Sequence, residues 1–171
     1  MRGVKIVVAI VIAIAPLACA TEDPTVLRSG GGLKRRTNNA PAVKASKQVP
    51  ATATEQEKCV DIINQYRATK GLSALTRWTD KEDCSDGEAE SDSKSGKAHG
   101  AFTQCTEMAQ NECPSYPGPV SDNLPECLAD MWAEGPGGGH YDNMTSKKYT
   151  KVACGIYELS DGDFWSVQNF R

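Results

Sequence analysis

Cysteine content limits the folds open to this chain more than any other feature. The sequence has seven cysteines among 171 residues, and six of them follow residue 55. No two of them are spaced Cys-x-x-Cys, so a zinc ribbon is not indicated. In an exported chain, an even set of cysteines predicts a disulfide framework. We expect up to three disulfides, with the pairing left open, although a bond between Cys105 and Cys113 would close a small loop. The six residues are Cys59, Cys84, Cys105, Cys113, Cys127 and Cys154.

The first twenty residues predict export. A short basic start precedes an apolar run at 6–17, which is too short to span a membrane but suits a secretory signal peptide. Cleavage after residue 20 fits the small residues around Cys19, and it would release a soluble protein. The same stretch is also a partial lipobox that would leave Cys19 lipidated. We expect a protein that is secreted or anchored to the cell envelope through a lipid, and the following tether-like segment slightly favours the anchor.

Charge divides the rest of the chain. Residues 21–54 carry six basic and two acidic side chains without apolar periodicity, so we expect a disordered basic linker. From residue 55 to the end there are 11 basic and 20 acidic residues, a net charge of −9. An acidic domain repels a polyanion, so no nucleic-acid partner is expected. The segment 55–171 is long enough for one folded domain with its own core.

Local signals predict several helices in this domain. Capping boxes at 54–57 and 79–82 each predict a helix start, and the first helix should end at Gly71. The second helix should stop near Gly96, with its dense carboxylates on a solvated face and small residues facing inward (Cys84, Gly87, Ala89 and Ser91). A third helix is predicted over 104–111. A fourth is predicted over 123–134, with Asn123 as its cap.

The C-terminal third reads as loop and strand. Glycines at 135–139 predict a loop that leads into His140. Segments 152–157 and 164–170 predict two strands, joined by a tight turn at Asp161-Gly162. Helices followed by a terminal hairpin indicate an α+β fold.

The order of several motifs resembles the CAP superfamily, which comprises cysteine-rich secretory, antigen 5 and pathogenesis-related 1 proteins. Asn64-x-x-Arg67, followed by Gly71-Leu72 and Trp78, is similar to the family's first helix and turn. Gly139-His140-Tyr141-x-x-Met144 resembles its histidine signature. Segments 152–155 and 167–170 resemble the strands that follow. Met-Trp-Ala-Glu at 131–134 is similar to small cysteine-rich bacterial members.

The resemblance implies a three-layer α-β-α sandwich, stabilised by disulfides, with a central cleft. In that cleft two histidines and two acidic residues would converge and hold a divalent metal such as zinc. The matching residues here are His99, His140 and Glu134. The other acidic position reads Gln110, in Ala109-Gln110-Asn111, so an amide replaces a carboxylate. Glu112 and Tyr141 are secondary candidates for the cleft.

Two classes of function follow. The preferred interpretation is a monomeric extracellular binding module whose ligand is a lipid, a peptide or a glycan. The alternative is a metal-dependent hydrolase in which His99 and His140 hold the metal and Glu134 acts as general base. A serine nucleophile is not indicated, because the sequence has no Gly-x-Ser-x-Gly motif.

Overall fold

The computed structural model describes residues 53–171. The predicted signal peptide, the lipidation candidate Cys19 and nearly all of the predicted linker lie outside the described residues. Within the described segment, no helix has both the length and the hydropathy that a membrane span needs.

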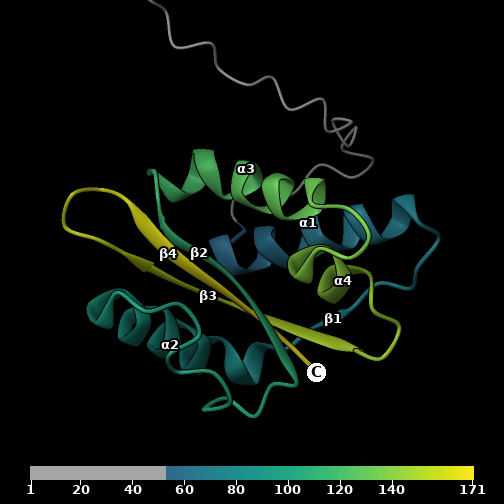
Figure 1. Cartoon of the computed structure of the whole chain (residues 1–171), viewed down its shortest axis with the longest axis horizontal. Helices are drawn as coiled ribbons and strands as arrows, with labels where there is room; N and C mark the ends of the chain where they lie inside the picture. The colour runs from purple at the N-terminus through teal and green to yellow at the C-terminus, as the bar shows by residue number, and fades with distance from the viewer. Residues whose placement is uncertain (1–52) are drawn as a thin grey trace, which may run out of the picture. The chain divides into compact units, whose positions relative to one another are not determined.

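A four-stranded sheet lies between helices on both faces (Figure 1). Its strands run in the order β1-β3-β4-β2, with β1 parallel to β3 and the other neighbours antiparallel. Helices α1, α3 and α4 cover one face and α2 covers the other, which confirms the predicted α+β three-layer sandwich. The helices are α1 (Glu55–Thr69), α2 (Glu82–Ser95), α3 (Val120–Ala133) and α4 (Gly139–Thr145), and the strands are β1 (Thr76–Arg77), β2 (Ala109–Tyr116), β3 (Lys151–Glu158) and β4 (Phe164–Phe170).

Helix α1 forms as its sequence predicts. The Thr54 hydroxyl accepts a hydrogen bond from the Glu57 N–H at 3.2 Å, which satisfies one free donor of the first turn. Cys59, Ile63 and other apolar side chains on one face are buried against the sheet and α3. The helix ends just before Gly71, whose φ of +65° is a left-handed conformation that glycine adopts without strain.

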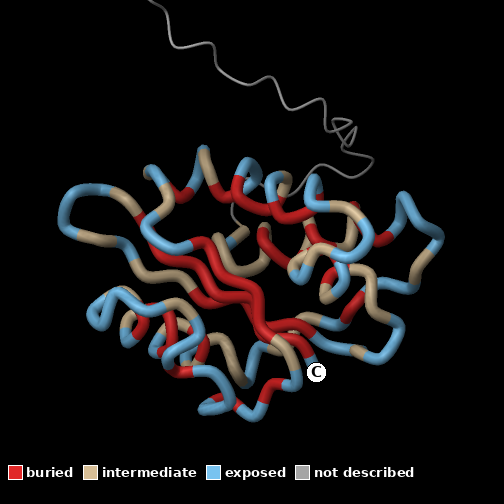
Figure 2. Tube along the Cα trace, viewed as in Figure 1, coloured by how far each residue is buried: buried red, intermediate tan, exposed pale blue. Residues whose placement is uncertain are grey.

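The two faces of the sheet differ in chemistry. The α1/α3/α4 side holds the larger apolar core, including Ile63, Leu128 and Phe170. The α2 side has a small apolar cluster around Trp165, and the buried strands run between the two (Figure 2). Helix α2 approaches β3 so closely that a Cβ at Gly155 would overlap the backbone of Ser85. The larger apolar core therefore lies on the α1/α3/α4 side, while buried polar side chains of β2 and β4 occur on both faces of the sheet.

The prediction of which α2 side chains face inward was wrong, except for Ala89. Gly87 and Ser91 are exposed and Cys84 is only half-buried, whereas Glu88 and Asp92 are buried. The prediction of a fully solvated carboxylate face was therefore also wrong. Buried carboxylates are tolerated there because strands β2 and β4 supply amide donors, described below.

The segment 104–111 is not a helix. Thr103 and Thr106 have φ values of +82° and +69°, which interrupt any helical turn. Ala109 then begins β2 opposite Phe170 of β4. The polar sequence of this strand lacks the alternation by which strands are recognised.

The starts of the later helices also differ from prediction. Helix α2 begins at Glu82 after a short 3-10 turn (Thr79–Lys81), and it has no capping side chain because its N-cap residue is Lys81, which lacks an acceptor. The Glu82 carboxylate pairs with Arg77 at 2.6 Å. Helix α3 begins at Val120 instead of 123, and the Asn123 amide donates back to the carbonyls of Pro117 and Gly118. His140 lies in the first turn of α4, not on a loop.

Three disulfides connect all six cysteines, as the even count predicted. Cys59 of α1 bonds to Cys154 of β3, Cys84 of α2 to Cys105, and Cys113 of β2 to Cys127 of α3. Cys105 and Cys113 therefore do not pair with each other. Each bond joins a helix to another part of the fold, so the disulfides hold the layers together.

Candidate functional site

Strand β2 positions the candidate site. It is an edge strand bonded only to β4 within the described sheet, and consecutive side chains point to opposite faces. Gln110 and Glu112 face α2, where they contact Glu88 and Trp165. Asn111 faces the other way and donates to the backbone carbonyl of His140 at 3.1 Å. Three consecutive residues of one strand thus contact both helical layers.

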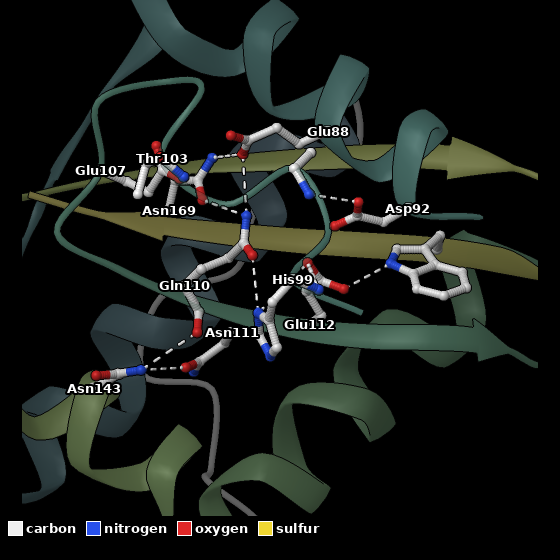
Figure 3. Close-up of polar contacts among 12 residues, drawn as sticks. Glu88, Asp92, His99, Thr103, Glu107, Gln110, Asn111, Glu112, Asn143 and Asn169 are labelled. Atoms are coloured by element: carbon white, nitrogen blue, oxygen red, sulfur yellow. Dashed lines mark hydrogen bonds and ion pairs between the residues drawn. The ribbon is translucent and has the colours of Figure 1, made fainter. Parts of the chain in front are cut away.

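His99 is held beside β2 by two side chains. Its backbone N–H donates to Glu112 Oε1 at 3.0 Å, and its ring Nδ1 lies 2.8 Å from Gln110 Oε1 (Figure 3). The Gln110 amide nitrogen donates to Glu88 and Asn169, so its oxygen is the atom left for the ring. Nδ1 therefore carries the proton and Nε2 is the acceptor. With its side chain 45% exposed, the ring presents Nε2 to solvent and to ligands.

His140 is held by one carboxylate. Glu134 Oε1 lies 2.5 Å from Nδ1, while Glu134 Oε2 accepts the backbone N–H of His140 at 3.1 Å. Glu134 follows α3 directly, and its side chain crosses the glycine loop to His140. A Cβ at Gly138 would overlap the Glu134 side chain, so this contact requires a glycine there. As at His99, Nδ1 is the bonded nitrogen, and Nε2 of this half-buried ring has no hydrogen-bond partner among the described residues.

Two interlocked amides join β2 to α4. Asn143 of α4 donates to Asn111 Oδ1 at 2.9 Å, and Asn111 donates to the carbonyl of His140. Asn143 also lies 3.4 Å from the Gln110 carbonyl. These bonds attach α4, which carries His140, to the edge strand β2, which carries Gln110.

Glu112 carries the most perturbed acid of the site. Its side chain is buried and accepts hydrogen bonds from the Trp165 indole at 2.9 Å and from the His99 backbone. Burial, with Asp92 alongside, raises the pKa of Glu112 to about 7, although both hydrogen bonds oppose the rise. This carboxyl exchanges its proton near neutral pH, next to His99.

A second buried polar cluster lies deeper under α2. Asn169 donates to Glu88 Oε2 at 2.5 Å, and Gln110 donates to the same Glu88 oxygen (Figure 3). Asn169 also donates to Ser85 at 2.9 Å. Burial raises the pKa of Glu88, and Glu107 nearby adds to the rise. The cluster supports the loop 97–108 from below, since Glu88 also accepts the Cys105 N–H and Glu107 accepts the Thr103 N–H.

The described residues contain one group of three His, Cys, Asp or Glu side chains with ligand atoms within 4.8 Å of one another: Glu88, Cys105 and Glu107. Cys105 is bonded to Cys84, so it has no thiolate to offer a metal. Two carboxylates remain, and both are engaged by N–H donors. This group suits a structural role better than a metal centre.

The structure divides the predicted site residues into two sets. It brings Glu134 to His140, and it brings Gln110 and Glu112 to His99. His99, His140 and Glu134 are not among the described groups of three close ligands, so a shared metal stays a prediction. Because the described residues supply no ready ligand set, we derive no step through a metal.

Other site residues had weak signals in the sequence. Tyr141 is buried against Trp132 in a tilted ring contact, beneath the Lys70 ammonium, and forms part of the core. The roles of Asn143 and Asn169 were missed. The signal available for Asn169 was an amide beside Phe170 in a strand whose seven residues are all buried, a position that requires a buried partner.

Comparison with known proteins agrees with this fold. The CAP profile, described as the cysteine-rich secretory protein family, matches residues 60–170. An extracellular protein of Bacillus anthracis containing an SCP domain superposes with a TM-score of 0.50 at 17% identity, over 68% of this chain and 40% of that one. A cysteine-rich secretory protein of Staphylococcus aureus gives 0.40 at 16% identity, over 72% and 41%.

The similarity thus spans about two fifths of each of those two structures. No curated protein matches the sequence. The family profile nevertheless covers more than half of the chain, including both histidines and β2 to β4. This chain therefore belongs to the cysteine-rich secretory protein (CAP) family.

Proposed function

We propose that this protein is an extracellular binding module whose recognition surface is the edge of β2 with His99 and His140. Three disulfides are typical of proteins that fold in an oxidising compartment. The Bacillus anthracis relative is described as extracellular, which supports the same location here. Anchoring through Cys19 belongs to this proposal as an option, because residue 19 lies outside the described residues.

One observation carries the proposal: each imidazole has Nδ1 bonded within the protein, and Nε2 has no hydrogen-bond partner among the described residues, so that a neutral ring offers it as an acceptor. Gln110 holds one ring and Glu134 holds the other, and the Asn111–Asn143 pair joins β2 to the helix that carries His140. Groups positioned before a ligand arrives lose little entropy on binding. Two preset acceptors suit a ligand rich in O–H or N–H donors, so a glycan or a peptide fits better than a lipid.

Hydrolysis through a protein nucleophile lacks support. The side chains bonded to the imidazoles are Gln110 and Glu134, neither of which is a serine, threonine or cysteine. All six cysteines of the described segment are in disulfides. The arrangement orients the rings without presenting a group to attack a substrate.

The test is a binding screen with the exported chain on glycan and peptide arrays, followed by titration of any ligand found. His140→Ala and His99→Asn should each weaken binding about tenfold, the cost of roughly one good hydrogen bond. Asparagine is chosen at 99 because it tolerates the φ of +58° there. Ser160→Ala, in the exposed turn between β3 and β4, is the control. Binding that survives both histidine substitutions would contradict the proposal.

A metal-dependent hydrolase is the second candidate, favoured by the Glu134–His140 pair. A carboxylate on Nδ1 is how metal-bound histidines are commonly oriented, with Nε2 as the ligand. Zinc titration by calorimetry on the wild type and on His140→Ala separates the two functions. Tight zinc binding that His140→Ala abolishes would favour the hydrolase. We expect no tight zinc binding to the wild type.

A further inference from the structure

A cavity of about 570 Å³ lies between the turn after α1 and the segment that joins α4 to β3. Its volume falls within the range of small-molecule sites. The polar side chains that line it are Arg67, Ser73, Thr76, Lys147, Tyr149 and Thr150. It is formed by different residues from those of the β2 edge, so it is a separate candidate site.

Arg67 is an unusual residue to find in this wall. It is 2% exposed, and no carboxylate of the described segment lies within ion-pair distance of it. Nε donates to the Ser73 carbonyl at 2.9 Å, and Nη1 donates to the carbonyls of Met144 and Ser146 at 2.8 and 2.9 Å. Nη2 has no acceptor within the described part of the chain. Burial lowers the pKa of Arg67, because a buried charge without a counter-ion is costly.

The cavity is cationic in an acidic domain. Arg67 and Lys147 line it, and none of its lining residues is an aspartate or glutamate, although the segment from 55 onward has 20 acidic and 11 basic residues. Hydroxyls of Ser73, Thr76 and Tyr149 add neutral donors. Cations and hydroxyl donors without competing carboxylates are the groups that bind oxyanions.

We propose that this cavity binds a phosphate ester, with Arg67 Nη2 and Lys147 as its cationic contacts. Arginine's planar fork matches phosphate oxygens, and the lysine adds a mobile charge at the rim. An incoming phosphate would supply the counter-charge that Arg67 lacks. Two sources share this chemistry: a soluble phosphate ester and the head group of an anionic phospholipid. Since Arg67 also holds the end of α4, the ligand would rest against the helix that carries His140.

Two adjacent lysines provide a matched test. Lys147 lines the cavity, whereas its exposed neighbour Lys148 does not. The full chain is titrated with glycerol phosphate, followed by NMR, and with phosphatidylcholine vesicles with and without phosphatidylglycerol. Lys147→Glu should weaken binding about tenfold or more, and Lys148→Glu less than twofold. Both variants carry the same basic segment 21–54, so its attraction to vesicles cancels in the comparison.

Each outcome decides the proposal. Lys147-dependent binding of glycerol phosphate supports it with a soluble source, and shifts should map to residues 71–76 and 147–150. Lys147-dependent binding of phosphatidylglycerol vesicles alone supports it with a lipid source. No binding of either, or equal losses in both variants, would overturn it, since equal losses indicate surface charge only. Thermal unfolding of each variant confirms that it folds, and Ser160→Ala, a substitution outside the cavity lining, should leave this binding unchanged.

Discussion

Glu112 should make this domain less stable as the pH rises from about 4.5 to about 7. Its carboxyl has a pKa of about 7 in the folded chain, compared with 4.5 for an unperturbed glutamate. The folded state therefore holds a proton that the unfolded state has released. The stability that this proton supplies is complete below the unfolded pKa and is lost as the pH passes through the folded pKa. The interval of 2.5 pH units corresponds to about 3 kcal/mol.

The assay is urea unfolding with the disulfides intact, followed by tryptophan fluorescence between pH 4.5 and 8. Trp165 contacts Glu112 directly, so its indole reports on this region. Glu112→Gln should cost about 1 kcal/mol at pH 4.5, because one of the two hydrogen bonds to the carboxyl is lost. Between pH 4.5 and pH 8, the free energy of unfolding of this variant should fall by about 3 kcal/mol less than that of the wild type.

The control is Glu158→Gln, because Glu158 is exposed at the end of β3. It should retain the wild-type dependence on pH. If Glu112→Gln also retained the full dependence, the assignment of the buried proton to Glu112 would be wrong. Glu88 and Asp86, whose pKa values burial also raises, would then be the residues to test.

Two further predictions concern packing and cross-linking. Gly155→Ala should destabilise the domain by about 2–3 kcal/mol, because the new Cβ would overlap the Ser85 backbone. Gly87→Ala should stabilise the domain by about 1 kcal/mol, because its new Cβ meets no atom within 4 Å on the exposed side of α2. If thermal unfolding gave the same change in stability for Gly155→Ala and Gly87→Ala, the close approach of α2 to β3 would be contradicted. Replacing Cys59 and Cys154 together by alanine should cost about 4 kcal/mol, because their bond closes the longest loop, with a sequence separation of 95. Denaturant titration measures this cost, and a loss below about 1 kcal/mol would refute the entropic argument.

Sequence patterns predicted the elements whose stabilising contacts join residues close together in the chain. Helix α1 has both its cap and its apolar spacing within 15 residues, and the β3–β4 hairpin has its turn beside its strands. Strand β2 was missed because it buries polar residues on both faces, so no alternation is visible. The inner face of α2 was missed because the amides that make burial of Glu88 possible come from Gln110 and Asn169, 22 and 81 residues away.

In the candidate site, too, contacts between residues close in the sequence were predictable and contacts between distant residues were not. Glu134 and His140 are six residues apart and meet across a glycine loop, so their contact was accessible from the sequence. Glu112 was only a secondary candidate, since its register in β2 decides that it faces His99. Disulfide pairing also depends on which layers approach, as with Cys113 of β2 and Cys127 of α3.

The buried proton and the binding surface share one residue. Glu112 Oε1 accepts the backbone N–H of His99, and its carboxyl also lies beside Asp92, which accepts the Ala101 N–H at 2.8 Å (Figure 3). Both acids therefore support the loop that presents His99. When Glu112 loses its proton, two buried carboxylates repel each other beneath that loop, and the energy of holding His99 in place rises. The loop that presents His99 should consequently be held less firmly in the same pH interval in which the domain loses stability, and Glu112→Gln should reduce both effects together.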